Sequence, residues 1–265
     1  MKNRCLIVIA TILLVFPVTS WGRTSSHEYL IKDSDLKSAN LIEKFGNYDF
    51  SPLFSGEHSE FNIGLIGEKY RRIRIKLISV LQNPFARRVY LIYGKSKVSD
   101  NICDFQGTIK ITEIRQYKPM HYGVDQKYKD KGIQFQGLLV ADYLFYENQR
   151  QSYSGYFSGK VYVGWYLDKD NKITYDDIES YSDRWCNSQF VGHWTSYSKK
   201  QQKVCNWGRA RIPHSGDLDL GAGEFYPNEK YWDQGWEVFY KAWWLHPPTD
   251  ESMKARDTER SEWWK

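Results

Sequence analysis

Apolar and polar residues alternate along most of the chain from residue 61 onward. Side chains at alternate positions of a strand share one face, so a period of two predicts strands that are buried on one side. Such segments lie at residues 61–66, 70–81, 88–98, 102–116, 133–146, 155–167, 173–175, 189–198 and 203–211. Turn-forming pairs such as Asn83-Pro84 and Ser99-Asp100 separate neighbouring segments. Connections this short favour antiparallel pairing, because parallel strands require long crossovers.

A repeated tripeptide indicates how these strands are shaped. Phenylalanine, any residue and glycine follow one another at Phe105-Gln106-Gly107, Phe135-Gln136-Gly137, Phe157-Ser158-Gly159 and Phe190-Val191-Gly192. A glycine within a strand permits strong bending, and a ring two residues away can cover the backbone that the glycine leaves bare. Strongly bent strands coil and close into barrels. We therefore predict an all-β fold, either a single antiparallel β-barrel or a strongly coiled β-sandwich, with a short peripheral helix.

The N-terminus predicts export. Lys2 and Arg4 precede an apolar run over residues 6–18, the pattern of a secretory signal that occupies residues 1–22. The apolar run is shorter than the ~20 residues that a membrane-spanning helix needs. We therefore expect a secreted or periplasmic protein with no integral membrane segment after signal cleavage.

The remaining chain divides into three predicted parts. Residues 23–59 are weakly periodic and predict an N-terminal arm packed on the main domain, with one short helix at residues 36–45. The β-barrel-like domain is expected at residues 60–245, a length sufficient for one large core. Residues 246–265 are charged and interrupted by proline, which predicts a flexible tail.

Charge argues against a nucleic-acid partner. The formal net charge of +5 falls to about +3 when Lys2 and Arg4 leave with the signal, and both signs are interleaved along the rest. A nucleic-acid-binding protein normally concentrates its basic residues in one stripe. The most basic segment, residues 70–77, alternates Arg and Lys with Ile and Leu, which favours a half-buried strand with a solvated outer face.

Three cysteines follow the signal: Cys103, Cys186 and Cys205. An odd number in an oxidising compartment allows at most one internal disulfide and one free thiol. Cys186 and Cys205 flank one predicted hairpin and are the predicted pair, and closing that loop would stabilise the fold by about 3 kcal/mol.

The segment after the last predicted strand concentrates charged residues among glycines. Asp217, Asp219 and Glu224 could supply the proton donor and the base of glycoside hydrolysis, in which paired carboxylates flank the bond. Alternatively, the segment is a long loop whose carboxylates accept hydrogen bonds from its own amides and pair with Arg209 and Arg211. The structural alternative is favoured.

Tryptophan is concentrated in the second half of the chain, at Trp165, Trp185, Trp194, Trp207, Trp232, Trp236, Trp243 and Trp244. Aromatic rings stack on sugars and line apolar cavities, although a large β core also uses them. The predicted ligand-binding residues combine two of these rings with the charged loop: Trp194, Trp207, Arg211, Asp217, Asp219 and Glu224.

Motifs for metals, cofactors and nucleophiles are absent from the sequence. The histidines lack ligand spacing, and neither His-Glu-x-x-His nor Gly-x-Ser-x-Gly occurs. Residues 168–177 superficially resemble a calcium loop, but aligning Ile173 with its hydrophobic position places Asp177 where a bidentate glutamate is expected. A polar hairpin turn is favoured there. We predict neither a metal site nor a cofactor.

Gly192-His193-Trp194 is similar to a motif of lipocalin-like barrels. Residues 93–98, 105–111 and 216–225 also resemble segments of uncharacterised secreted β-rich proteins of gram-negative bacteria, over about residues 60–240. The resemblance implies an exported protein of β character and assigns no activity.

The leading functional hypothesis is an exported, non-enzymatic barrel that binds a small molecule or a glycan in an aromatic-lined pocket. The first alternative is a secreted carbohydrate-active enzyme, which requires two of the loop carboxylates to lie about 5–9.5 Å apart in one cleft. The second alternative is a surface interaction module, which would expose a broad apolar area instead of a pocket.

Overall fold

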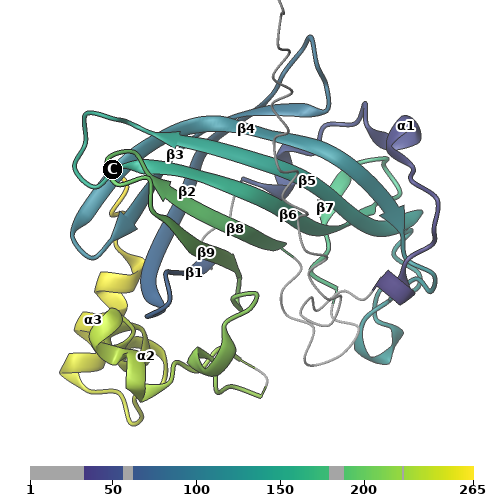
Figure 1. The fold of residues 1–265 in the computed structure, drawn as a ribbon. Helices are drawn as coiled ribbons and strands as arrows, with labels where there is room; N and C mark the ends of the chain where they lie inside the picture. The colour runs from purple at the N-terminus through teal and green to yellow at the C-terminus, as the bar shows by residue number, and fades with distance from the viewer. Residues whose placement is uncertain (1–32, 56–61, 179–187, 223) are drawn as a thin grey trace, which may run out of the picture.

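A computed structural model describes residues 33–55, 62–178, 188–222 and 224–265 of this chain. Its centre is an antiparallel sheet with the strand order β5-β4-β3-β2-β1-β9-β8-β6, and pairing of β5 with β6 closes it into an eight-stranded barrel (Figure 1). Strand β7 pairs with the end of β6 that extends beyond β8. The prediction of an all-β fold is confirmed, and of the two predicted architectures the single antiparallel barrel is the one that forms.

The strands lie within a few residues of the predicted segments. They are β1 (Asn62–Ile66), β2 (Arg71–Gln82), β3 (Val89–Val98), β4 (Asn101–Gln116), β5 (Phe135–Glu147), β6 (Gly155–Leu167), β7 (Ile173–Tyr175), β8 (Ser188–Ser196) and β9 (Gln202–Arg209). The helices are η2 (Asp33–Asp35), α1 (Ile42–Phe45), η3 (Ser51–Leu53), η5 (Val124–Gln126), η6 (Gly216–Leu218), η7 (Glu229–Gln234), α2 (Glu237–Trp243) and α3 (Asp250–Arg260). Within the described ranges, no helix is long and apolar enough to cross a membrane.

Strand alternation separates the barrel core from its outer wall. On β4, Phe105 and Ile109 point inward and are buried, whereas Gln106 and Lys110 are exposed. Irregular pairing after Ile111 resets this alternation, as a β-bulge does. The inward side chains of the barrel strands form one continuous hydrophobic core.

The four phenylalanines of the repeated tripeptide all lie in barrel strands and are buried. Two of the glycines, Gly159 and Gly192, are directly opposite each other in the β6–β8 pair. A Cβ atom added to Gly192 would lie 2.6 Å from Tyr143 Oη and 2.8 Å from the Cα of Gly159. The two strands and the tyrosine therefore fit together only because this pair of positions has no side chains.

The covering rings differ from the predicted arrangement. Phe135 covers Gly137 from two residues away, as predicted, with a ring atom 2.9 Å from the position of an added Cβ. At Gly94, in contrast, the nearest ring is that of Phe105, which is its register partner on β4, at 2.5 Å. A residue directly opposite on a paired strand lies closer than one two positions along the same strand, so most glycines are covered from the neighbouring strand.

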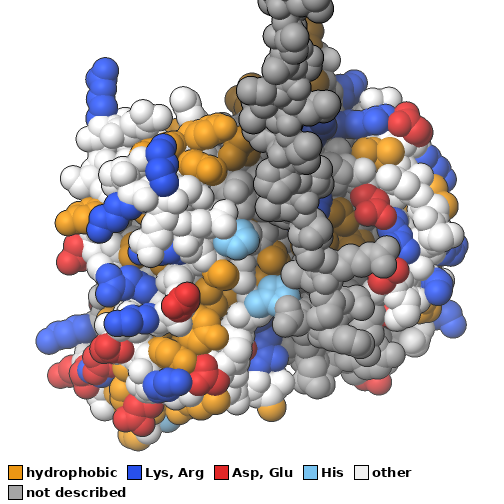
Figure 2. Space-filling view, in the orientation of Figure 1, with side chains coloured by type: hydrophobic (Ala, Val, Ile, Leu, Met, Phe, Trp, Pro, Cys, Tyr) orange, Lys and Arg blue, Asp and Glu red, His pale blue; other side chains and the backbone are white. Residues whose placement is uncertain are grey.

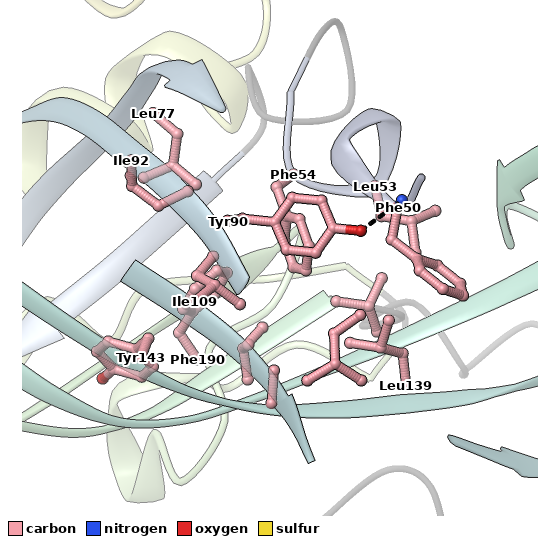
Figure 3. Close-up of a cluster of buried hydrophobic side chains, with 14 of the residues drawn as sticks. Phe50, Leu53, Phe54, Leu77, Tyr90, Ile92, Ile109, Leu139, Tyr143 and Phe190 are labelled. Atoms are coloured by element: carbon pink, nitrogen blue, oxygen red, sulfur yellow. Dashed lines mark hydrogen bonds between the residues drawn. The ribbon is translucent and has the colours of Figure 1, made fainter. Parts of the chain in front are cut away.

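The described part of the N-terminal arm packs into one end of the barrel. Phe45 and Phe50 contact the ring of Trp165 edge-on, at centroid distances of 5.4 and 5.1 Å. The backbone N–H of Phe50 donates a hydrogen bond of 2.9 Å to Tyr90 Oη, so the buried hydroxyl anchors the arm (Figure 3). These side chains belong to the same core as the strands.

The C-terminal helices pack on the outside of β1 and β2. Ile63 and Leu65 of β1 form a second hydrophobic cluster with residues that include Trp236. Acidic and basic side chains are intermixed over this helical part of the surface, at the lower left of the view (Figure 2). The cluster explains why β1 is apolar on both faces: one face points into the barrel and the other lies beneath the helices.

A buried ion pair holds α3 against the barrel. Arg72 of β2 donates two hydrogen bonds, of 2.7 and 2.5 Å, to the carboxylate of Glu259. The two side chains are only 10% and 7% exposed. The guanidinium also lies 5.4 Å from the ring of Trp236 and 5.3 Å from that of Phe239. Residues 246–265 were predicted to be a flexible tail, but most of them form the ordered helix α3. The contact with Arg72 and the capping box at Thr249 stabilise this helix.

The outward side chains Arg72, Arg74 and Lys76 form a basic row on β2. This row is covered by the C-terminal part of the chain and is not solvated. Arg74 donates to the backbone carbonyl of Glu259 at 2.7 Å and lies 5.4 Å from the ring of Trp263. The ammonium of Lys76 lies 4.6 Å from the ring of Trp264. The alternation in residues 70–77 correctly indicated a strand, but the chain returns from almost 200 residues away to cover it.

Gly192→Ala should destabilise the barrel by about 1–3 kcal/mol, as overpacking typically does. The added methyl group would meet both Tyr143 Oη and the carbonyl oxygen of Ser158. Urea unfolding measures the change, and Lys160→Ala on the exposed face of β6 is the control that should stay near the wild type. Wild-type stability in Gly192→Ala would contradict the proposed close fit.

Glu259→Ala should weaken the docking of α3 by about 3–5 kcal/mol, because it leaves the Arg72 charge buried without its partner. Glu251→Ala in the same helix is the matched control. It removes an exposed pair with Lys241, worth at most about 1 kcal/mol. Hydrogen exchange of the α3 amides distinguishes them, and equal protection in both variants would rule out an anchoring role for Glu259.

Candidate functional site

The two tryptophans of the predicted ligand-binding set lie inside the barrel. Trp207 stacks on Phe190 at a centroid distance of 4.6 Å and contacts Tyr143 edge-on at 5.3 Å. Trp194 is also buried, and its indole Nε1 donates a hydrogen bond to Glu147. Both rings are therefore packing elements of the core, and neither lines an accessible mouth of the barrel.

The charged members of the predicted set lie in the loop that follows β9. Arg211 Nε donates to Asp219 Oδ2 at 3.0 Å, and both side chains are mostly buried. The other oxygen of Asp219 accepts from the backbone N–H groups of Gly221 and Tyr226, at 2.9 and 3.1 Å. Asp219 thus organises its own loop, which is the structural alternative considered from the sequence.

The other two carboxylates of the loop have different surroundings. Asp217 accepts hydrogen bonds from Tyr231 Oη at 2.6 Å and from Lys230 Nζ at 3.0 Å, and these two contacts lower the pKa of the carboxyl. Glu224 is exposed. Arg209, the other predicted partner, places its guanidinium 4.8 Å from the ring of Tyr175. These contacts give each acid a different structural environment and provide no support for paired catalytic carboxylates.

A buried carboxylate that the sequence did not single out lies at the opposite end of the barrel from the arm. Glu147 is 5% exposed and ends β5 on its inward face. It accepts hydrogen bonds from Ser96 Oγ at 2.5 Å, from the Gly155 N–H at 2.8 Å and from Trp194 Nε1 at 2.9 Å. Burial raises the pKa of Glu147, and the three donors only partly oppose this shift.

The sequence did contain a signal for this residue. Inward positions of β5 recur every two residues through Tyr143 and Phe145, and the next position in that series is Glu147. The predicted strand ended one residue earlier, at residue 146, so Glu147 fell just outside it. Its hydrogen bonds join β3, β5, β6 and β8 at this end of the barrel.

The cysteines near Glu147 are poor nucleophiles. Burial, followed by the charge of Glu147, raises the pKa of Cys103 to about 11 and that of Cys205 well above its ordinary value. A thiol of such high pKa remains protonated near neutral pH, which argues against thiolate chemistry. Cys205 is a free, buried thiol, so the predicted disulfide with Cys186 is not supported; Cys186 itself lies outside the described residues.

The segment that resembles a calcium loop forms a hairpin turn. Asp168 Oδ1 accepts hydrogen bonds from the backbone N–H groups of Asp170 and Lys172, both at 2.9 Å. In the part of the chain that the structure describes, no group of three or more His, Cys, Asp or Glu residues could hold a metal ion.

Tyrosines form a row on the outer wall of the barrel. Tyr93 on β3 is the register partner of Gln106 on β4, which pairs with Tyr146 on β5, and Tyr146 pairs with Tyr156 on β6. Tyr93 and Tyr146 are 41% and 48% exposed. The rings of Tyr146 and Tyr156 lie 5.9 Å apart, and that of Tyr197 follows at 6.1 Å. Register places Tyr146 and Tyr156 side by side on neighbouring strands and Tyr93 in line with them two strands away, with Gln106 between.

Polar side chains border this tyrosine row. Tyr93 Oη donates to Asp104 Oδ1 at 3.0 Å, and Gln151 Nε2 donates to Asp104 Oδ2 at 2.9 Å. Lys95 lies 3.7 Å from the same carboxylate. The hydrogen bond to Asp104 raises the pKa of Tyr93. Aromatic faces therefore lie beside a carboxylate, an amide and an ammonium group, all within reach of one ligand.

No protein-family model, curated protein or solved structure matches this chain. Function is therefore inferred from the geometry of its own residues. The lipocalin-like motif Gly192-His193-Trp194 lies in β8, late in the barrel, and contributes the glycine of the close β6–β8 contact. Its resemblance to lipocalins, like that of the longer segments to secreted proteins, stays a prediction.

The raised pKa of Glu147 predicts a loss of stability with increasing pH. A carboxyl that binds its proton more tightly in the folded state stabilises that state fully below its unfolded pKa, about 4.3. This contribution is lost as the pH rises through the higher folded-state pKa. From pH ~4 upward, the free energy of unfolding should therefore decrease more in the wild type than in Glu147→Gln.

Denaturant unfolding over this pH range measures the difference between the two proteins. Glu68→Gln, at an exposed position, is the matched control and should reproduce the wild-type profile. Cys103, Cys205 and Tyr197 also lie near Glu147. Because both proteins contain these residues, the difference between the two pH profiles reports on Glu147. Parallel pH profiles for the wild type and Glu147→Gln would show that the carboxyl does not titrate as expected.

Proposed function

We propose that this chain is an exported, non-enzymatic binding protein that holds a glycan on the tyrosine row of its outer wall. The observation that supports the proposal is the register of Tyr93, Tyr146 and Tyr156 across four strands. Adjacent strands are about 4.8 Å apart, so the row extends over roughly 14 Å, the length of a short oligosaccharide.

The chemistry of the row suits a sugar better than a purely apolar ligand. Sugar rings present C–H groups on their faces, which pack on aromatic rings, and hydroxyl groups at their edges. Asp104 and Gln151 at the border of the row offer a hydrogen-bond acceptor and an amide. Gln106 is exposed between Tyr93 and Tyr146 and adds a second amide in line with the rings.

The distribution of aromatic residues favours the outer wall over an interior pocket. Inside the barrel, aromatic rings from β4, β5, β6, β8 and β9 contact one another. For example, Phe105 contacts Phe157, and Phe157 contacts Trp207. A ligand would have to displace these contacts, whereas the outer tyrosines are already exposed. Export is supported by the predicted N-terminal signal, and it would bring the protein to extracellular or cell-envelope polysaccharides.

Binding to polysaccharides tests the proposal. We expect the purified protein to co-sediment with at least one of cellulose, chitin and peptidoglycan, or to be retarded in gels that contain soluble glucans, mannans or galactans. Tyr146→Ala should weaken that binding by about tenfold, because it removes the central ring of the row. Gln106→Ala should weaken it less, since it removes a hydrogen bond and leaves the stacking surface.

Phe85→Ala is the matched control, because Phe85 is an exposed aromatic residue in the turn between β2 and β3, outside the row. It should bind like the wild type. Absence of binding to every polysaccharide, or equal binding by Tyr146→Ala and the wild type, would overturn the proposal.

A further inference from the structure

The hairpin formed by β2 and β3 is basic without any acidic residue. Between Glu68 and Asp100 the chain contains no Asp or Glu. The same segment contains Lys69, Arg71, Arg72, Arg74, Lys76, Arg87, Arg88, Lys95 and Lys97. Some of these charges are matched by other parts of the chain, since Arg72 pairs with Glu259 and Arg88 with Glu43. Arg87, in the turn of the hairpin, is exposed.

The same hairpin exposes an unusual amount of apolar surface near its turn. Phe85 in the turn is 98% exposed, and Leu81 and Leu91 on the outer wall are 61% and 47% exposed. Leu81 and Leu91 are register partners, so their side chains lie side by side on one face. Figure 1 shows the turn between β2 and β3 extending beyond the body of the barrel. A group of large exposed apolar side chains bordered by polar residues is typical of an interaction site.

Hydrogen bonds order the turn that presents Phe85. Asn83 Oδ1 accepts from the backbone N–H of Phe85 at 2.9 Å, and the carbonyl of Asn83 accepts from the N–H of Ala86 at 3.2 Å. Gln82 Nε2 donates to the carbonyl oxygens of Arg87 and Tyr48, both at 2.9 Å. The turn is thus tied to the arm, and its exposed ring is held outward before any partner binds.

We propose that this turn docks on an anionic lipid surface, with Phe85 and Leu81 in the interfacial region and Arg87 beside the phosphate groups. Insertion of apolar side chains and attraction of basic residues to anionic lipids are the two contributions that hold a peripheral protein on a bilayer. A lipid surface suits a protruding turn, because the bilayer requires no shape complementary to it. The hairpin itself contributes no carboxylate that would repel an anionic surface, and Glu43 of the arm, which contacts the hairpin, is paired with Arg88.

Vesicle co-sedimentation tests the proposal with the full chain. Binding should be strong for vesicles of phosphatidylcholine mixed with phosphatidylglycerol and weak for phosphatidylcholine alone, and added salt should reduce it. Phe85→Ser should lower the partition coefficient on the mixed vesicles by about tenfold, given the apolar area of one ring. Arg87→Glu should lower binding to the mixed vesicles and leave the weak binding to phosphatidylcholine unchanged.

Tyr153→Ser is the matched control. Tyr153 is an aromatic residue that is 85% exposed, in the turn between β5 and β6 at the opposite end of the barrel. It should bind vesicles like the wild type, and so should Tyr146→Ala, which separates this proposal from glycan binding. The proposal would be overturned if Phe85→Ser bound vesicles like the wild type, or if the wild type bound both kinds of vesicle equally. It would also be overturned if Phe85 mediated self-association in place of vesicle binding.

Discussion

The close approach of β6 and β8 beneath Tyr143 is the contact on which the barrel depends. Gly159 and Gly192 lie opposite each other, and the phenol oxygen of Tyr143 occupies the space that their side chains would need. A closed barrel of eight strands has an interior just wide enough for side chains. Tyr143 fits into that interior because the backbone that faces its hydroxyl is bare, so this pair of glycines makes room for one of the large side chains of the core.

Because side chains fill the interior of the barrel, a ligand can bind only on its outer wall. Inward positions carry the rings of the core and, at one end, the hydrogen-bonded carboxylate of Glu147. The outward positions between them, including Tyr93 and Tyr146, remain available to solvent. One register therefore produces both surfaces: the pairing that aligns the core phenylalanines also aligns the outer tyrosines.

Segments from both ends of the chain complete the barrel. The arm supplies Phe50 to the interior at one end, and the C-terminal helix α3 covers the basic row of β2 through the pair of Arg72 with Glu259. Beyond this covered row, the same β2 continues into the exposed turn around Phe85. The hairpin thus has a buried basic half that stabilises the fold and an exposed half that is free to meet a partner.

Local sequence determined the strands and their inward faces, because a period of two and turn residues act over a few positions. It located the four buried phenylalanines, limited the fold to a barrel or a coiled sandwich, and favoured the structural interpretation of Asp219. Tertiary structure alone decided that Trp194 donates to Glu147, that Tyr93 and Tyr146 fall into one row, and that α3 docks on Arg72. Each of these depends on strand register or on partners that lie far away in the chain, and no local pattern encodes which distant residues will meet.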